Sequence, residues 1–114
     1  MALGHAGRDL TAMSRVIAVF NLKSQVLEHD YEAWAKRVDI PTVNALPSVG
    51  SFEVLKVTGQ LGSDAPPPYR YIEVIDIQDE EGFARDVASA PMQKIASEFR
   101  AMVDVAFLKT EKVG

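Results

Sequence analysis

The chain has 114 residues, the length of one domain, and 47% of them are hydrophobic, which is enough for a packed core. Its formal net charge of -4 argues against nucleic-acid binding, because phosphate contacts need clustered lysine and arginine. The absence of cysteine excludes disulfides, thiolate catalysis and cysteine-ligated metal centres. No apolar run approaches the roughly 20 residues of a membrane span, and we recognise no secretion signal. We therefore expect a soluble cytoplasmic protein with neither nucleic acid nor a membrane as its partner.

Residues 1–14 are predicted to form a flexible arm, because small and polar residues follow one another there without a period. Residues 15–114 are predicted to form a single folded domain. Runs of β-branched and aromatic residues predict four strands in this domain. The predicted strands cover residues 15–22, 50–58, 69–77 and 104–110.

The first strand is followed by a predicted helix over residues 23–39, for which Ser24 is the expected N-cap. One apolar stripe of this helix is expected to face the sheet. The stripe consists of Leu27, Tyr31, Trp34 and Val38. Pro41 suits the first turn of a short helix that follows, and Asp39 is a candidate cap for it.

The connection Gly59–Pro68 ends in three consecutive prolines and is predicted to be long and irregular, serving either as a lid or as a dimer contact. After the third strand, Asp79 is expected to cap a helix whose first turn is acidic. Ser89 and Pro91 are expected to open a further helix before the last strand.

The order of elements is strand, helix, strand, strand, helix, strand, which is the ferredoxin-like βαββαβ pattern of the α+β class. This pattern gives a four-stranded antiparallel sheet with its helices on one face. Three strands are apolar at consecutive positions, so both of their faces should be buried. The uncovered face would otherwise form an apolar patch larger than a monomer usually shows. We therefore expect a homodimer, sheet against sheet, of the dimeric α+β barrel kind; the alternative is a third layer supplied by the arm.

Several short motifs resemble the RedY-like, or HapK-like, family. The most specific is D-x-P-T-V at residues 39–43, followed by L-P-x-V at residues 46–49. Weaker matches lie at residues 31–35, 51–55 and 68–73, and the resemblance covers about residues 15–111. It implies the dimeric α+β barrel, a ligand cleft between sheet and helices, and small aromatic or nitrogen-heterocyclic ligands. The family is associated with biosynthetic pathways for prodigiosin-type tripyrrole pigments.

Glu73 is the candidate catalytic residue, because it lies inside an otherwise apolar strand. A buried carboxylate has a raised pKa and can act as a general acid or base. The alternative is a structural salt bridge with Lys56, in a strand pairing that also sets Val54 opposite Ile75. This register is the one we expect, because it matches apolar side chains with apolar side chains.

Seven further residues are candidates for substrate binding: Asn21, Tyr31, Trp34, Asp39, Thr42, Lys56 and Tyr71. Asn21 offers a donor and an acceptor to a ligand carbonyl, or else it is a turn residue. The flat faces of Tyr31 and Trp34 suit an aromatic ligand, although core packing is the favoured interpretation of Trp34. Asp39 and Thr42 form either a polar rim of the cleft or a helix cap, and Asn44 shares both interpretations. Cofactor-independent monooxygenases of the same broad architecture use asparagine and tryptophan near their substrates, a likeness at the level of the fold only.

No cofactor and no metal site are predicted. The two histidines do not form a site, and the sequence contains neither a dinucleotide-binding fingerprint nor a P-loop. We therefore expect a small-molecule-binding protein. It is either a metal- and nucleotide-independent enzyme that acts on a pyrrole- or indole-like intermediate, or an accessory protein that shields such an intermediate. An enclosed cavity containing a polar group of perturbed pKa would favour the enzyme.

Overall fold

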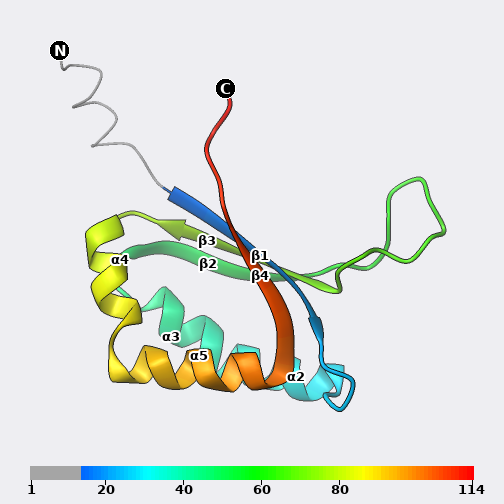
Figure 1. The fold of residues 1–114 in the computed structure, drawn as a ribbon, viewed down its shortest axis with the longest axis horizontal. Coiled ribbons are helices and arrows are strands. Elements are labelled where there is room, and N and C mark those ends of the chain that lie inside the picture. The colour runs from blue at the N-terminus through cyan, green and yellow to red at the C-terminus, as the bar shows by residue number, and fades with distance from the viewer. Residues whose placement is uncertain (1–13) are drawn as a thin grey trace.

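A computed structural model describes residues 14–114, so the predicted arm lies outside the described residues except for Ser14. Four strands form one sheet in the order β2-β3-β1-β4, and every neighbouring pair is antiparallel. They are β1 (Ser14–Leu22), β2 (Val49–Lys56), β3 (Tyr71–Ile77) and β4 (Val103–Lys109). The predicted ferredoxin-like fold is confirmed, with its helices packed beneath one face of the sheet (Figure 1).

Between β1 and β2 the chain forms one uninterrupted helical run. It comprises α2 (Glu28–Trp34), the π-helical turn η1 (Ala35–Asp39) and α3 (Ile40–Asn44). The run begins after Leu27, so Ser24 is not its N-cap, and the side chain of Asp39 makes no capping hydrogen bond. The expected break into two capped helices is wrong because Asp39 itself has helical backbone angles.

Two helices connect β3 to β4, α4 (Glu80–Val87) and α5 (Ala90–Met102). The predicted cap of α4 is confirmed, since the amide of Gly82 donates to Asp79 Oδ1 at 2.9 Å. Pro91 lies in the first turn of α5, where its missing amide proton is not needed.

The pairing of β2 with β3 differs from the expected register by two residues. Val54 lies opposite Glu73, and Lys56 lies opposite Tyr71. A shift of two residues leaves every side chain on the same face, so hydrophobic alternation does not distinguish the two registers. The register is held where the strands leave the sheet, because the amide of Val57 donates to the carbonyl of Arg70 at 2.7 Å.

The core lies between the sheet and the helices in two groups of buried side chains. In the first group, Phe20 stacks on Tyr71 and meets Tyr31 and Phe99 edge to face. The second group lies towards the other end of the sheet and comprises Val43, Val49, Phe52, Ile75 and Ile77. On β3, Glu73 falls between the two groups and faces the helices as they do.

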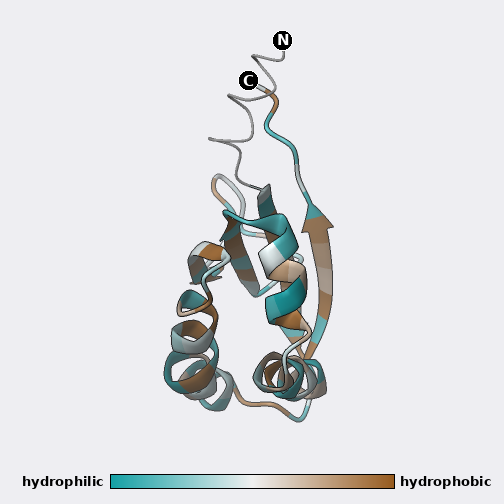
Figure 2. Ribbon diagram, turned by 90° about the vertical axis from the view of Figure 1, so that its left-hand side faces the viewer, coloured by the Kyte–Doolittle hydropathy of each residue, from teal (hydrophilic) through white to brown (hydrophobic). Residues whose placement is uncertain are grey.

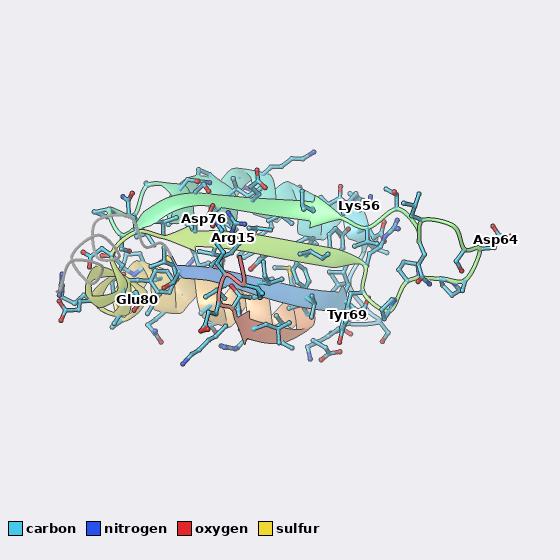
Figure 3. All side chains as sticks on the ribbon, turned by 90° about the horizontal axis from the view of Figure 1, so that it is seen from above. Arg15, Lys56, Asp64, Tyr69, Asp76 and Glu80 are labelled. Carbon is cyan, nitrogen blue, oxygen red and sulfur yellow. The ribbon has the colours of Figure 1, made fainter. Side chains whose placement is uncertain are left out.

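The opposite face of the sheet is covered by nothing in residues 14–114, and Figure 3 looks onto it. Strand alternation places a set of apolar side chains there, namely Ile17, Val19, Leu55, Ile72, Val74, Ala106 and Leu108. Figure 2 shows how apolar the strands are. Leu55 and Leu108 are each 47% exposed. Polar residues occupy one end of this face, where Arg15 and Asp76 pair at 2.6 Å. No helix among the described residues is long and apolar enough to cross a membrane.

Candidate functional site

A cavity of about 460 Å³ lies between the sheet and the helices, in the size range of small-molecule sites. Every strand and every helical element except α2 contributes to its wall. Most of the lining side chains are apolar: Val16, Val43, Phe52, Ile75, Phe83, Val87, Met92, Ile95, Ala96, Phe99 and Phe107. The polar side chains of the wall are Asp39, Glu73, Gln93, Arg100 and Lys109.

Glu73 lies at the buried floor of this cavity and is 4% exposed. No salt bridge to Lys56 forms, because the observed register places the lysine opposite Tyr71, two residues from Glu73 along β3. Burial raises the pKa of Glu73 to about 8, and the negative charge of Asp39 contributes to this shift. A neutral carboxylic acid near pH 7 is the form that can donate a proton.

Asp39 is the second carboxyl group of the cavity and is also 4% exposed. Burial alone raises the pKa of Asp39 to about 7, since no neighbouring cation or hydrogen-bond donor counters it. Between the pKa values of these two groups, the most populated state is therefore the one in which Asp39 is ionised and Glu73 is protonated. The two groups thus supply a base and an acid within one apolar cavity.

The π-helical turn explains why Asp39 points inward. The buried residues of the helical run follow one another at intervals of four, at Tyr31, Ala35, Asp39 and Val43. In a regular α-helix this interval drifts by about 40° at each step, and the wider π turn reduces the drift. The expected stripe is only partly correct: Tyr31 is buried, whereas Leu27, which precedes α2, is 59% exposed, and Trp34 and Val38 are only half-buried.

Tyr31 is fully buried, and its hydroxyl group has no hydrogen-bond partner in the described part of the chain. Burial raises the pKa of this hydroxyl, and the charges of Glu73 and Asp39 raise it further. The hydroxyl therefore lies within electrostatic reach of the carboxyl pair and keeps its proton. A buried polar group without a partner is uncommon and marks a site that a bound molecule or water can complete.

Lys56 and Tyr71 belong to a separate polar network at the end of the sheet near α2. The Tyr71 hydroxyl donates to Glu32 Oε2 at 2.7 Å, and Lys56 Nζ lies 2.7 Å from the same oxygen. Arg70 Nε donates to Glu28 Oε2 at 2.7 Å and joins this network to the connection after β2. Lys56 was expected to pair with Glu73 and Tyr71 to contact a ligand, and the structure instead directs the polar atoms of both towards α2.

Asn21 lies at the exposed end of β1, outside the cavity wall. Its Nδ2 donates to the carbonyl of Pro68 and its Oδ1 accepts from the amide of Arg70, each at 2.9 Å. The side chain thus holds the end of the Gly59–Pro68 connection against β1. A turn-like structural role was one of the two interpretations of this residue.

Trp34 does not line the cavity and packs against the first group of core side chains, as its core-packing interpretation expected. Its Nε1 donates to Glu98 Oε1 at 2.9 Å, and its ring stacks on Phe99 with 6.3 Å between the centroids. Thr42 is half-buried on α3 and does not line the cavity. Asn44 fastens α3 to β2, since it donates to the carbonyl of Phe52 and accepts from its amide, each at 3.0 Å.

The structure therefore brings Glu73 and Asp39 together, places the hydroxyl of Tyr31 near them, and separates the other candidates. Sequence reasoning missed Arg100 and Lys109, which are exposed residues of the cavity wall. The sequence does contain a signal for these two residues, because each is a basic residue close to an aromatic residue of the cavity wall. Arg100 follows the buried Phe99, and Lys109 shares a strand face with Phe107. No group of three or more metal-binding side chains occurs in residues 14–114.

Comparison with known protein families identifies one family that matches this chain. The sequence profile described as REDY-like protein HapK matches residues 14–113. The crystal structure of HapK from Hahella chejuensis is similar, with 31% identity, a TM-score of 0.72, and coverage of 90% of this chain and 94% of that one. No curated protein sequence matches the chain.

Two more distant structures show the fold alone. SnoaB, a cofactor-independent oxygenase from Streptomyces nogalater, is 14% identical, with a TM-score of 0.71 and coverage of 90% of this chain and 94% of that one. A dimeric ferredoxin-like protein of unknown function from Thermobifida fusca is 18% identical, with a TM-score of 0.69 and coverage of 89% and 92%.

Proposed function

Because the chain belongs to the REDY-like protein HapK family, we propose that it binds a small pyrrole- or indole-like molecule and catalyses proton transfer on it. The observation that carries this proposal is the pair of carboxyl groups, Glu73 and Asp39, in the wall of an apolar cavity. Raised pKa values near neutrality, in a cavity large enough for one or two fused rings, are typical of an acid–base site.

In the proposed reaction, the ionised Asp39 accepts a proton from one position of the ligand while Glu73 donates its proton to another. The ligand is thereby isomerised, and the pair ends with Asp39 protonated and Glu73 ionised. Only protons move, so this step needs no oxidant and no redox cofactor. Return of the proton from Asp39 to Glu73 restores the starting state.

The experiment compares the wild-type protein with Glu73→Gln and Asp39→Asn against a panel of pyrrole and indole compounds. Thermal shift reports binding, and mass-neutral rearrangement or solvent deuterium uptake by the ligand reports proton transfer. We expect both variants to bind the same compounds and to lose deuterium incorporation by about 100-fold or more. Glu111→Gln, at an exposed position beyond β4, is the matched control.

Binding without any deuterium incorporation by the wild-type protein would favour the second candidate function, an accessory protein that shields an intermediate. That alternative is supported by the same cavity but makes no use of the raised pKa values. Unchanged deuterium incorporation in Glu73→Gln would remove Glu73 from the mechanism.

The proposal includes a homodimer formed through the uncovered face of the sheet. Support comes from the exposed Leu55 and Leu108 on that face and from the apolar residues between them. A specific interface buries about 1,600 Å² in total, which a face of four strands can supply. The cavity lies on the opposite side of the sheet, so each subunit keeps its own site.

A further inference from the structure

The charged residues of the cavity wall are divided by sign. The two acidic residues, Asp39 and Glu73, are buried at the floor, on η1 and β3. The two basic residues, Arg100 on α5 and Lys109 on β4, are exposed at the mouth, together with Gln93. Phe107 is 46% exposed beside them and lies beneath the Arg100 guanidinium, 5.7 Å from ring centroid to Cζ.

Neither basic residue forms a salt bridge within residues 14–114, whereas several other cations of this part of the chain do. Lys94 pairs with Glu98 at 2.7 Å, and Lys56 pairs with Glu32 at the same distance. Arg100 and Lys109 therefore have free donors at the entrance of an otherwise apolar cavity. A neutral ligand would make no use of these charges.

We propose that the ligand is an aromatic anion, with its carboxylate or a comparable acidic group held at the mouth by Arg100 and Lys109. This inference rests on the proposed function and assigns both the substrate class and the direction of binding. An anionic group at the floor would be repelled by the ionised Asp39, whereas at the mouth it meets two cations. The uncharged end of the ligand therefore reaches Glu73 and Asp39, where protons are exchanged.

Two dyes of nearly identical shape test the assignment. Anilinonaphthalene sulfonate carries an acidic group, and N-phenyl-naphthylamine is its neutral counterpart. Both become fluorescent in apolar surroundings, so their affinities can be titrated directly. We expect the sulfonate to bind more tightly than the neutral dye, by about fivefold or more at low salt.

The variants Arg100→Gln and Lys109→Gln should each weaken sulfonate binding about two- to fivefold and leave the neutral dye unchanged. Arg85→Gln on α4 and Lys112→Gln beyond β4 are the matched controls, because both residues are exposed and lie outside the cavity wall. Added salt should reduce the affinity of the sulfonate only.

The uncovered face of the sheet can also bind such dyes, so binding must be assigned to the cavity. Ala96→Phe fills the cavity from α5, and Val87→Phe fills it from α4, so that one of the two is informative if the other fails to fold. Binding that these variants weaken is cavity binding. Equal cavity affinities for the two dyes, unaffected by the glutamine variants, would overturn the anion assignment and leave the proposed function standing. Dye binding that neither filling variant weakens would overturn both.

Discussion

Glu73 and Asp39 destabilise the fold in which they lie, because burial without a counter-charge favours the protonated form of each. Their pKa values rise to about 8 and about 7, from ordinary values of 4.5 and 3.8. Ionising such a group in the folded state costs on the order of 4 kcal/mol. A stable apolar substitution would remove this cost, so the retained carboxyl groups point to a use of their protons.

This cost predicts a definite pH dependence of stability. Between about pH 5 and pH 8 the folded state binds more protons than the unfolded state, so the free energy of unfolding should fall as the pH rises. Above about pH 8 both carboxyl groups are ionised, and the free energy of unfolding has fallen by the full cost of their ionisation. Urea unfolding at a series of pH values measures the effect.

The variant Glu73→Gln tests whether ionisation of Glu73 causes this pH dependence of stability. The glutamine cannot ionise, so the variant should be more stable than the wild-type protein at pH 8 and nearly equal to it at pH 5. Glu28, Glu32 and Asp76 do not change the stability between pH 5 and pH 8. Ion pairing lowers their pKa values, so their contribution to the free energy of unfolding is lost only below their ordinary pKa values. A free energy of unfolding that rises from pH 5 to pH 8 would contradict the explanation.

A second prediction at the scale of single residues concerns the hydroxyl groups of two buried tyrosines. The Tyr31 hydroxyl has no partner, so Tyr31→Phe should leave stability unchanged or raise it by about 1 kcal/mol. Tyr71→Phe is the matched control, because it removes the bond to Glu32 and should lower stability by about 1–2 kcal/mol. Equal losses in both variants would show that a water molecule satisfies Tyr31.

At the scale of elements, the run from α2 to α3 delivers Asp39 to the cavity, and Asn44 fixes the end of that run. Strand β2 is an edge strand, and the backbone of Phe52 would be unpaired on its outer side without the amide of Asn44. Asn44 therefore joins helix to sheet and also covers part of an open edge.

Asn44→Ala should lower the free energy of unfolding by about 2–3 kcal/mol, because it leaves two backbone groups of Phe52 without partners. Asn44→Asp keeps the acceptor for the Phe52 amide and should lose about half as much. Denaturant titration of the three proteins gives the comparison. An alanine variant as stable as the wild-type protein would show that water replaces both bonds.

At the scale of the whole molecule, the layered arrangement leaves one question, which is what covers the bare face of the sheet. The helices cover one face only, and the apolar side chains of the other face lie on all four strands, with Leu55 and Leu108 on the two edge strands exposed. A second copy related by a two-fold axis is the simplest cover, because two-fold symmetry pairs a face with itself.

We expect light scattering to give the mass of a dimer for the wild-type protein and the mass of a monomer for Val74→Glu. The glutamate would place a charge at the centre of the interface, on β3, without touching the helices. Leu61→Glu is the control, because Leu61 is fully exposed in the connection after β2 and should leave the mass unchanged. A monomeric wild-type protein would overturn the proposed assembly.

The sequence by itself determined the order of elements and the ferredoxin-like fold. Consecutive apolar residues indicate strands, Asp79 indicates the start of a helix, and both are local signals within a few residues of chain. It also singled out Glu73, because a carboxyl group among apolar neighbours is visible in the sequence, and it named Asp39 as either a helix cap or part of the rim of the cleft.

Only the tertiary structure decided which of these residues meet. The β2–β3 register separated Glu73 from Lys56, and a two-residue shift leaves no trace in the alternation of apolar side chains. The π-helical turn brought Asp39 inward, because a helix that departs from 3.6 residues per turn no longer follows the period read from the sequence. Contacts between distant segments depend on such small offsets in geometry, and the local pattern of side chains does not specify them.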